Sequence, residues 1–225
     1  MKMNMEDNMY KYILFDLDGT LTDPGLGITN AVMHALKKFN IEVPDRSELY
    51  KFIGPPLLES FEKYYGMSEE ESQIALQYYR EYFKPYGLYE NTVYDGIEEL
   101  LVTLKAQEKK LILATSKPEL FAIEILRHFE LEKYFDFIAG ATMDEKRVRK
   151  ADVIAYALES CEITELSEAI MVGDREHDVL GAKEVGMVCV GVLYGYGDLE
   201  ELEKAGADYI AEKPEDILKI VSERK

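Results

Sequence analysis

Two carboxylates close together near the start of the chain are the first residues that could carry chemistry. Asp16 and Asp18 directly follow the apolar run Tyr12–Phe15, and Gly19 comes next. Four such residues are the length of a short buried strand, and open α/β sheets bind ligands beyond the carboxyl ends of their strands. Two acids at such an edge, before a glycine that allows a tight turn, predict a site for a hard cation and an anionic substrate. The competing interpretation is an acidic turn after an edge strand.

The segments that must position these acids alternate between strand and helix patterns. Apolar runs of strand type recur at residues 110–114, 135–139, 169–172, 188–192 and 209–210. Apolar residues at helical spacing lie between these runs, for example at Phe121, Ile125 and Phe129. The alternation predicts an α/β fold with a Rossmann-like, doubly wound parallel sheet.

A long stretch without any strand pattern follows the first two acids. Between Asp23 and Tyr89 the sequence has only helical patterns, and Ser68 with Glu71 has the spacing of a helix capping box. A loop between a strand and a helix usually has about 2–6 residues, so roughly 65 helical residues here predict an inserted domain. We expect an all-helical domain at residues 24–89 and an α/β core at residues 1–23 and 90–225.

The string Asp16-Leu17-Asp18-Gly19-Thr20 resembles the first motif of the haloacid dehalogenase-like phosphatase superfamily. The resemblance implies that Asp16 is a nucleophile that becomes aspartyl-phosphate, and that Asp18 is a general acid and base. It also implies a Mg²⁺ cofactor held by Asp16 and Asp18, the latter through its backbone carbonyl, and a helical cap that closes over the site. A carboxylate can attack phosphorus at neutral pH when a cation offsets the phosphate charge. A second carboxyl group can protonate the leaving alkoxide and then deprotonate water.

Polar residues after the run at 110–114 resemble the second motif of the same superfamily. Thr115 would bind a phosphoryl oxygen, Ser116 could donate as well, and Lys117 is a further candidate for binding the substrate. A threonine at this place could also be an ordinary helix N-cap. The order of the motifs favours phosphate binding.

Lys150 resembles the lysine of the third motif, where one ammonium offsets the charge of nucleophile and phosphate together. Lys146, Arg147 and Arg149 are alternatives within four residues. We prefer Lys150 because it opens a predicted helix, whose N-terminus favours anions.

The acids of Gly-Asp-x-x-x-Asp at residues 173–178 resemble the fourth motif. By this resemblance Asp174 ligates Mg²⁺, and Asp178 acts through water or holds Lys150. Magnesium keeps several waters and uses few carboxylates, so Asp16, the Asp18 carbonyl and Asp174 suffice. All four motifs occur in order, which is a far stronger signal than any one of them.

The motifs predict a phosphatase that hydrolyses a small phosphate ester. Dehalogenation is disfavoured because it needs no magnesium and has little use for Asp18. A phosphomutase and a non-catalytic phosphate-binding module remain alternatives. The sequence most resembles the phosphoglycolate phosphatase and 5'-nucleotidase-like group. Residues 52–57, which include Gly54, predict a rigid loop of the cap that contacts the leaving group of the substrate.

Charge restricts the partners of the chain. Its 225 residues include 26 Lys and Arg against 44 Asp and Glu, a net charge of −18. Such acidity argues against nucleic-acid and anionic-membrane partners. Residues 1–8 lack the apolar region of a signal peptide and predict a short disordered lead, so we expect a cytoplasmic protein. We also expect a monomer or a homodimer.

Overall fold

A parallel sheet forms the centre of the molecule. The computed structural model describes residues 10–144 and 146–222; the predicted disordered lead at residues 1–8 lies outside them. The described residues form a six-stranded sheet in the order β5-β4-β1-β6-β7-β8, with every neighbouring pair parallel. The strands are β1 (Tyr12–Phe15), β4 (Lys110–Pro118), β5 (Phe137–Ala141), β6 (Ala169–Gly173), β7 (Val188–Val192) and β8 (Tyr209–Ala211). The predicted doubly wound α/β fold is confirmed.

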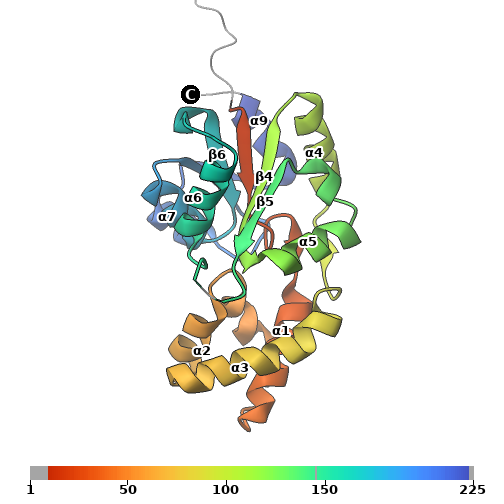
Figure 1. Cartoon of the computed structure of the whole chain (residues 1–225), viewed down its shortest axis with the longest axis vertical. Coiled ribbons are helices and arrows are strands. Elements are labelled where there is room, and N and C mark those ends of the chain that lie inside the picture. Colours follow the sequence, from red (N-terminus) through yellow and green to blue (C-terminus); the bar gives the residue numbers. More distant parts are fainter. Residues whose placement is uncertain (1–9, 145, 223–225) are drawn as a thin grey trace, which may run out of the picture.

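Helices cover both faces of the sheet, because the strands are apolar on both sides (Figure 1). Ile13 and Phe15 of β1 pack in one apolar cluster, and Leu14 packs in the other. The first face carries α4 (Ile97–Ala106), α5 (Glu119–His128) and α9 (Pro214–Ser222). The second face carries α6 (Lys150–Ser160), α7 (Glu176–Glu184) and α8 (Leu199–Ala205). Two short 3₁₀ turns are η3 (Glu132–Tyr134) and η4 (Leu166–Glu168).

A helical body lies beyond the carboxyl ends of the central strands, at the bottom of Figure 1. Its elements are α1 (Gly25–Lys38), the 3₁₀ helix η1 (Arg46–Phe52), α2 (Leu57–Tyr65), α3 (Glu69–Tyr82) and the π-helical turn η2 (Phe83–Gly87). We call this body, residues 25–87, the cap. Apolar residues such as Phe52, Phe61 and Phe83 fill its interior. The predicted capping box is confirmed, because Ser68 and Glu71 exchange side-chain-to-backbone hydrogen bonds at the start of α3.

Two short strands join the cap to the core, and the sequence patterns did not predict them. They are β2 (Thr22–Asp23) and β3 (Thr92–Val93), which pair antiparallel. With two residues each they are too short to show a period-two alternation. Asp95 and Glu98 have the spacing of a helix capping box, which predicts Asp95 as the N-cap of α4. That prediction is wrong, because Gly96, at φ +85°, occupies the N-cap position without a side-chain hydrogen bond.

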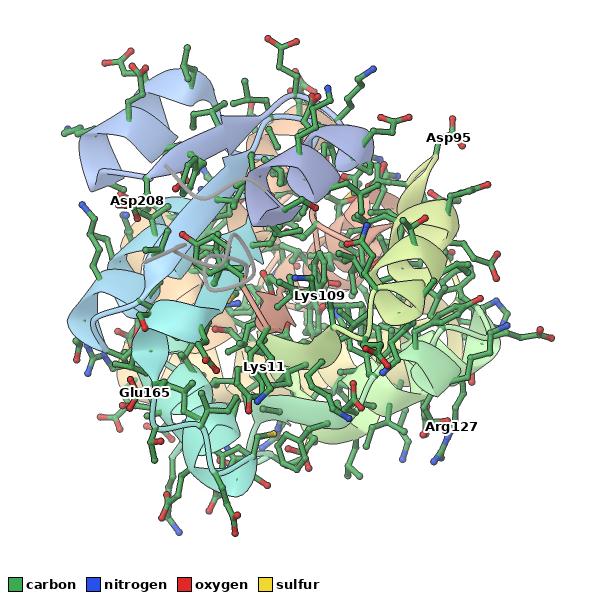
Figure 2. The ribbon with its side chains drawn as sticks, turned by 90° about the horizontal axis from the view of Figure 1, so that it is seen from above. Lys11, Asp95, Lys109, Arg127, Glu165 and Asp208 are labelled. Atoms are coloured by element: carbon green, nitrogen blue, oxygen red, sulfur yellow. The ribbon has the colours of Figure 1, made fainter. Side chains whose placement is uncertain are left out.

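A lysine is buried near the end of the molecule opposite the cap (Figure 2). Lys109 is 4% exposed and donates from Nζ to the carbonyl of Tyr10 at 2.6 Å. Burial lowers the pKa of this lysine. Within the described residues, none of the helices has the length and apolar character needed to span a membrane.

Candidate functional site

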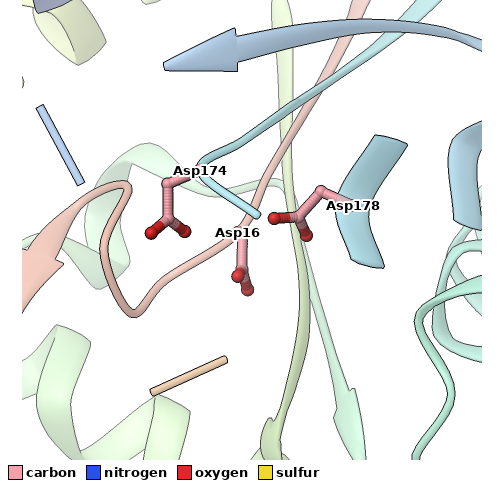
Figure 3. A group of neighbouring side chains, drawn as sticks. All are labelled: Asp16, Asp174 and Asp178. Carbon is pink, nitrogen blue, oxygen red and sulfur yellow. The ribbon is translucent and has the colours of Figure 1, made fainter. Parts of the chain in front are cut away.

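Three buried carboxylates converge at the carboxyl end of the sheet (Figure 3). Asp16 follows β1, Asp174 follows the neighbouring β6, and Asp178 lies in the first turn of α7. One carboxylate oxygen of each lies within 4.8 Å of the others, and none of the three residues is more than 4% exposed. Since β1 and β6 are parallel neighbours, their ends meet at one edge of the sheet. The structure therefore brings these three predicted residues together.

A buried lysine lies between two of these acids. Nζ of Lys150 is 2.8 Å from a carboxylate oxygen of Asp16 and 2.8 Å from one of Asp178, and it donates to the carbonyl of Ala114 at 3.0 Å. Burial by itself would lower the pKa of Lys150, but the two carboxylates raise it above its ordinary value of 10.5. This lysine is therefore a permanent cation in the site.

The other basic residues near Lys150 point to different partners. Lys146, Arg147 and Arg149 each form an ion pair outside the carboxylate cluster; the partners are Asp144, Glu119 and Glu184, respectively. The geometry thus favours Lys150 over the alternatives that the sequence left open.

The carboxylate cluster has the character of a cation site. Burial, and then the charges of neighbouring carboxylates, raise the pKa of Asp174 well above its ordinary value of 3.8. Burial also raises the pKa of Asp178, although Lys150 acts in the opposite direction. Burying three acids beside a single lysine is unfavourable without further positive charge. A donor set made only of oxygens suits Mg²⁺, which Asp16 and Asp174 could hold.

Asp18 lies on the side of the site that faces the cap. It forms a buried ion pair with Nζ of Lys117, which also lies 4.8 Å from the ring centre of Phe83 in the cap. Oδ1 of Asp18 has no hydrogen-bond partner among the described residues. Burial raises the pKa of Asp18, and Lys117 offsets part of this effect. Lys117 therefore contacts both the cap and Asp18, the predicted general acid and base.

The predicted phosphate-binding hydroxyls lie at the end of β4. Thr115 is 2% exposed, and its Oγ1 accepts a hydrogen bond from the backbone N–H of Lys117 at 3.2 Å. It is not a helix N-cap, because Pro118 takes that position for α5. Ser116 is half-buried and lines the space between the core and the cap.

A cavity of about 70 Å³ separates the core site from the cap. Asp18, Ser116 and Lys117 line it from the core. The cap side is mostly apolar and includes Phe52, Gly54, Leu76, Tyr79 and Phe83. Gly54 has φ +101°, a backbone conformation that favours glycine. The structure thus brings the predicted cap loop to the same cavity as Asp18.

Two further residues reach the site from positions to which the motifs assigned no role. The backbone N–H of Tyr196 donates to Oδ2 of Asp174 at 2.8 Å, and the Tyr196 hydroxyl bonds the carboxylate of Asp23. Arg175 directly follows Asp174 and extends to the cap. For Tyr196, the sequence signal is the pair of glycines that flank it within residues 194–197. Glycine is needed there because a Cβ atom at Gly197 would lie 2.0 Å from the Asp174 carbonyl oxygen.

Comparisons with known proteins agree with this geometry. Residues 13–192 match the family described as haloacid dehalogenase-like hydrolase. The chain is 48% identical over 193 residues to a 5'-nucleotidase from Pseudomonas aeruginosa, covering 86% of this chain and 87% of the relative. It is 40% identical over 200 residues to the tyrosine-protein kinase PtkA of Mycobacterium tuberculosis, covering 88% of this chain and 67% of that protein.

A solved structure is similar over almost its whole length. The crystal structure of a predicted phosphatase from Clostridium acetobutylicum superimposes with a TM-score of 0.91 at 51% identity, covering 94% of this chain and 100% of that one. A parallel α/β core with convergent acids defines the class of enzyme, and the chain belongs to the haloacid dehalogenase-like hydrolases. Within that family it is a phosphatase.

Proposed function

We propose that the chain is a Mg²⁺-dependent phosphomonoesterase that works through an aspartyl-phosphate formed on Asp16. The observation that carries this proposal is the convergence of Asp16, Asp174 and Asp178 in one buried site, where Lys150 pairs with Asp16 and Asp178. A carboxylate can act as a nucleophile in such a place, since fixed positive charge can stabilise the charge that develops on the phosphoryl group.

Magnesium would be held by Asp16, Asp174 and the backbone carbonyl of Asp18. When bound, Mg²⁺ supplies the positive charge that offsets phosphate oxygens during nucleophilic attack. Support comes from the oxygen-only donor set and from the environment of Asp174, whose pKa is raised first by burial and then by the charges of Asp178 and Asp16. Asp178 pairs with Lys150 and so holds this lysine next to Asp16.

The residues then divide the work of hydrolysis. An Asp16 oxygen forms a bond to phosphorus while the bond to the leaving oxygen breaks, and Asp18 gives that oxygen a proton. Asp18 next takes a proton from the water that attacks the phosphorus and frees Asp16. Its raised pKa favours carrying the proton needed in the first step. Thr115 and Ser116 would donate hydrogen bonds to phosphoryl oxygens.

The substrate we propose is a small phosphorylated metabolite, either a 5'-nucleotide or a phosphoglycolate-like ester. Relatives named 5'-nucleotidase and phosphoglycolate phosphatase, at 48% and 28% identity, support this class. The cavity of about 70 Å³ is far below the roughly 300–1,000 Å³ of ordinary ligand pockets. We therefore propose that residues 24–89, which contain the cap, form one domain and that residues 1–23 and 90–225 form the core domain. The cap opens from the core to admit substrate, and Gly54 and Lys117 contact the substrate.

A panel of phosphomonoesters assayed with and without Mg²⁺ tests the proposal. Inorganic phosphate should be released from at least one 5'-nucleotide or from phosphoglycolate, and a chelator should abolish the release. Unchanged hydrolysis of any ester in the presence of excess chelator would contradict the metal dependence.

Transfer of the phosphoryl group to an acceptor other than water, as in a mutase, is the second candidate. It is favoured by the 40% identical relative that is named a tyrosine-protein kinase. A radiolabelled phosphoryl donor separates the two reactions, because hydrolysis releases the label as inorganic phosphate and transfer retains it on the acceptor.

A further inference from the structure

Arg175 connects the carboxylate site with the cap. Its backbone N–H donates to Oδ2 of Asp178 at 3.1 Å, next to the candidate metal ligand Asp174. Its side chain leaves the site, and Nη1 donates to the backbone carbonyl of Ile53 in the cap at 2.6 Å. The side chain is 12% exposed, so this charge-assisted hydrogen bond is largely shielded from water.

The carbonyl that Arg175 binds belongs to Ile53, the first residue of the loop at residues 53–56, which we call the specificity loop. Ile53 is the C-cap of η1, and Gly54 follows in the left-handed region at φ +101°. A Cβ atom at Gly54 would lie 3.1 Å from Cγ of Arg175, so the loop packs on the arginine stem as well as on its guanidinium. The same loop lines the cavity that Asp18 faces.

The guanidinium is held from the opposite side by the core. Oε1 of Glu201 in α8 accepts hydrogen bonds from Nε of Arg175 and from the backbone N–H of Glu176, each at 2.8 Å. Glu201 thereby fixes the direction in which Arg175 extends. The arginine is a rigid connection from the core to the specificity loop, because both ends of its guanidinium are bound.

We propose that Arg175 is a positioning residue that holds the specificity loop against the leaving group and so determines which phosphate esters are hydrolysed. This inference rests on the proposed function of the site. A hydrogen bond to a charged group changes an equilibrium by about ten- to a hundredfold. Loss of Arg175 should therefore loosen the loop by that order, and esters that touch the loop should lose more than esters that do not.

Kinetics on two probes test this role. We expect Arg175→Met to lower kcat/KM for p-nitrophenyl phosphate at least about tenfold more than for acetyl phosphate, mainly through KM, because only the larger leaving group reaches the loop. Arg175→Lys should recover part of the difference. Arg127→Met is the matched control, since Arg127 pairs with Glu132 on the surface and should leave both substrates unaffected. Equal losses on both substrates would overturn the proposal.

Hydrogen exchange provides a readout that does not depend on catalysis. In Arg175→Met, amides in a peptide covering residues 50–58 should exchange faster, whereas Arg127→Met should match the wild type there. Unchanged exchange in Arg175→Met would also overturn the proposal. If the wild type hydrolyses neither these probes nor any ester of the panel, the proposed function fails, and this measurement still decides whether Arg175 holds the loop.

A double-mutant cycle with Gly54→Ala completes the test. The alanine strains the specificity loop at a positive φ. It should therefore reduce the preference for the larger probe by displacing the same loop that Arg175 holds. If Arg175 acts through the loop, the double variant should lose much less than the product of the two single losses. Fully multiplicative losses would mean that Arg175 acts elsewhere.

Discussion

At the scale of single residues, Asp16 decides whether the covalent mechanism is right. We predict that Asp16→Asn abolishes turnover and leaves the fold intact, because a neutral amide is a poor nucleophile and a poor ligand for Mg²⁺. Steady-state phosphate release and circular dichroism measure the two parts. Activity above a few per cent of the wild type, in a preparation free of wild-type enzyme, would contradict the covalent route.

Asp18 allows a finer test of the same chemistry. General acid and base assistance is worth about 10²–10⁴-fold, and a poor leaving group needs it most. Asp18→Asn should therefore lose more activity on alkyl phosphates than on p-nitrophenyl phosphate, in a comparison of kcat/KM values. If kcat/KM falls by the same factor for both substrates, Asp18 holds the metal or supports the structure, for example through its ion pair with Lys117.

The placement of a candidate side chain could be predicted from the sequence where it directly follows a strand. Asp16 and Asp174 follow apolar runs whose ends must meet in a parallel sheet, so their convergence could be expected. The partners of Lys117 and Arg175 could not be expected. Lys117 binds Asp18 and Arg175 binds the Ile53 carbonyl, and both contacts join segments about a hundred residues apart that no local pattern relates.

At the scale of elements, the helical insert was predictable because strand periodicity is absent over a long stretch. Its attachment was not, since β2 and β3 have two residues each and resemble ordinary turns. The start of α4 shows another limit. A capping pattern at Asp95 competes with a glycine next to it, and the backbone at Gly96 takes a conformation that only glycine adopts readily.

The specificity loop is the element whose replacement should change substrate preference. We predict that substituting Gly54-Pro55-Pro56 by Ala-Ala-Ala alters the ranking of the larger phosphate esters and affects acetyl phosphate much less. The physical reason is that the loop lines, from the cap, the cavity that Asp18 lines from the core. The measurement is kcat/KM across the ester panel.

Two outcomes would count against this role of the loop. A uniform loss on every ester would mean that the loop supports the fold or the closure of the cap. An unchanged ranking would place the specificity surface elsewhere.

At the scale of the whole molecule, the buried acids connect catalysis with stability. Burial raises the folded-state pKa of Asp174 and Asp178 above 3.8 in the metal-free protein. The folded state then binds protons more tightly than the unfolded chain. These groups therefore stabilise the metal-free fold fully below pH 3.8, and this contribution is lost as pH rises through their raised pKa values.

Magnesium should reverse this trend, because it binds the deprotonated acids. We predict that Mg²⁺ raises the melting temperature more at pH 8 than at pH 5. At a hundred times its Kd a ligand stabilises by about 2.7 kcal/mol, which for a chain of this size is roughly 5–10 °C. Differential scanning calorimetry in MgCl₂, against NaCl of equal ionic strength, measures the shift and controls for screening of the net charge of −18.

Two asparagine variants locate the effect. Asp174→Asn should remove most of the Mg²⁺ response, since it removes a buried carboxylate from the cluster. Asp144→Asn is the matched control: Asp144 is exposed, pairs with Lys146, and its pKa is lowered to about 2 by hydrogen bonds from Thr142 and Lys146. The control should respond as the wild type does. If Asp174→Asn keeps the full shift, or if the wild-type shift is equal at both pH values, the metal binds outside the carboxylate cluster.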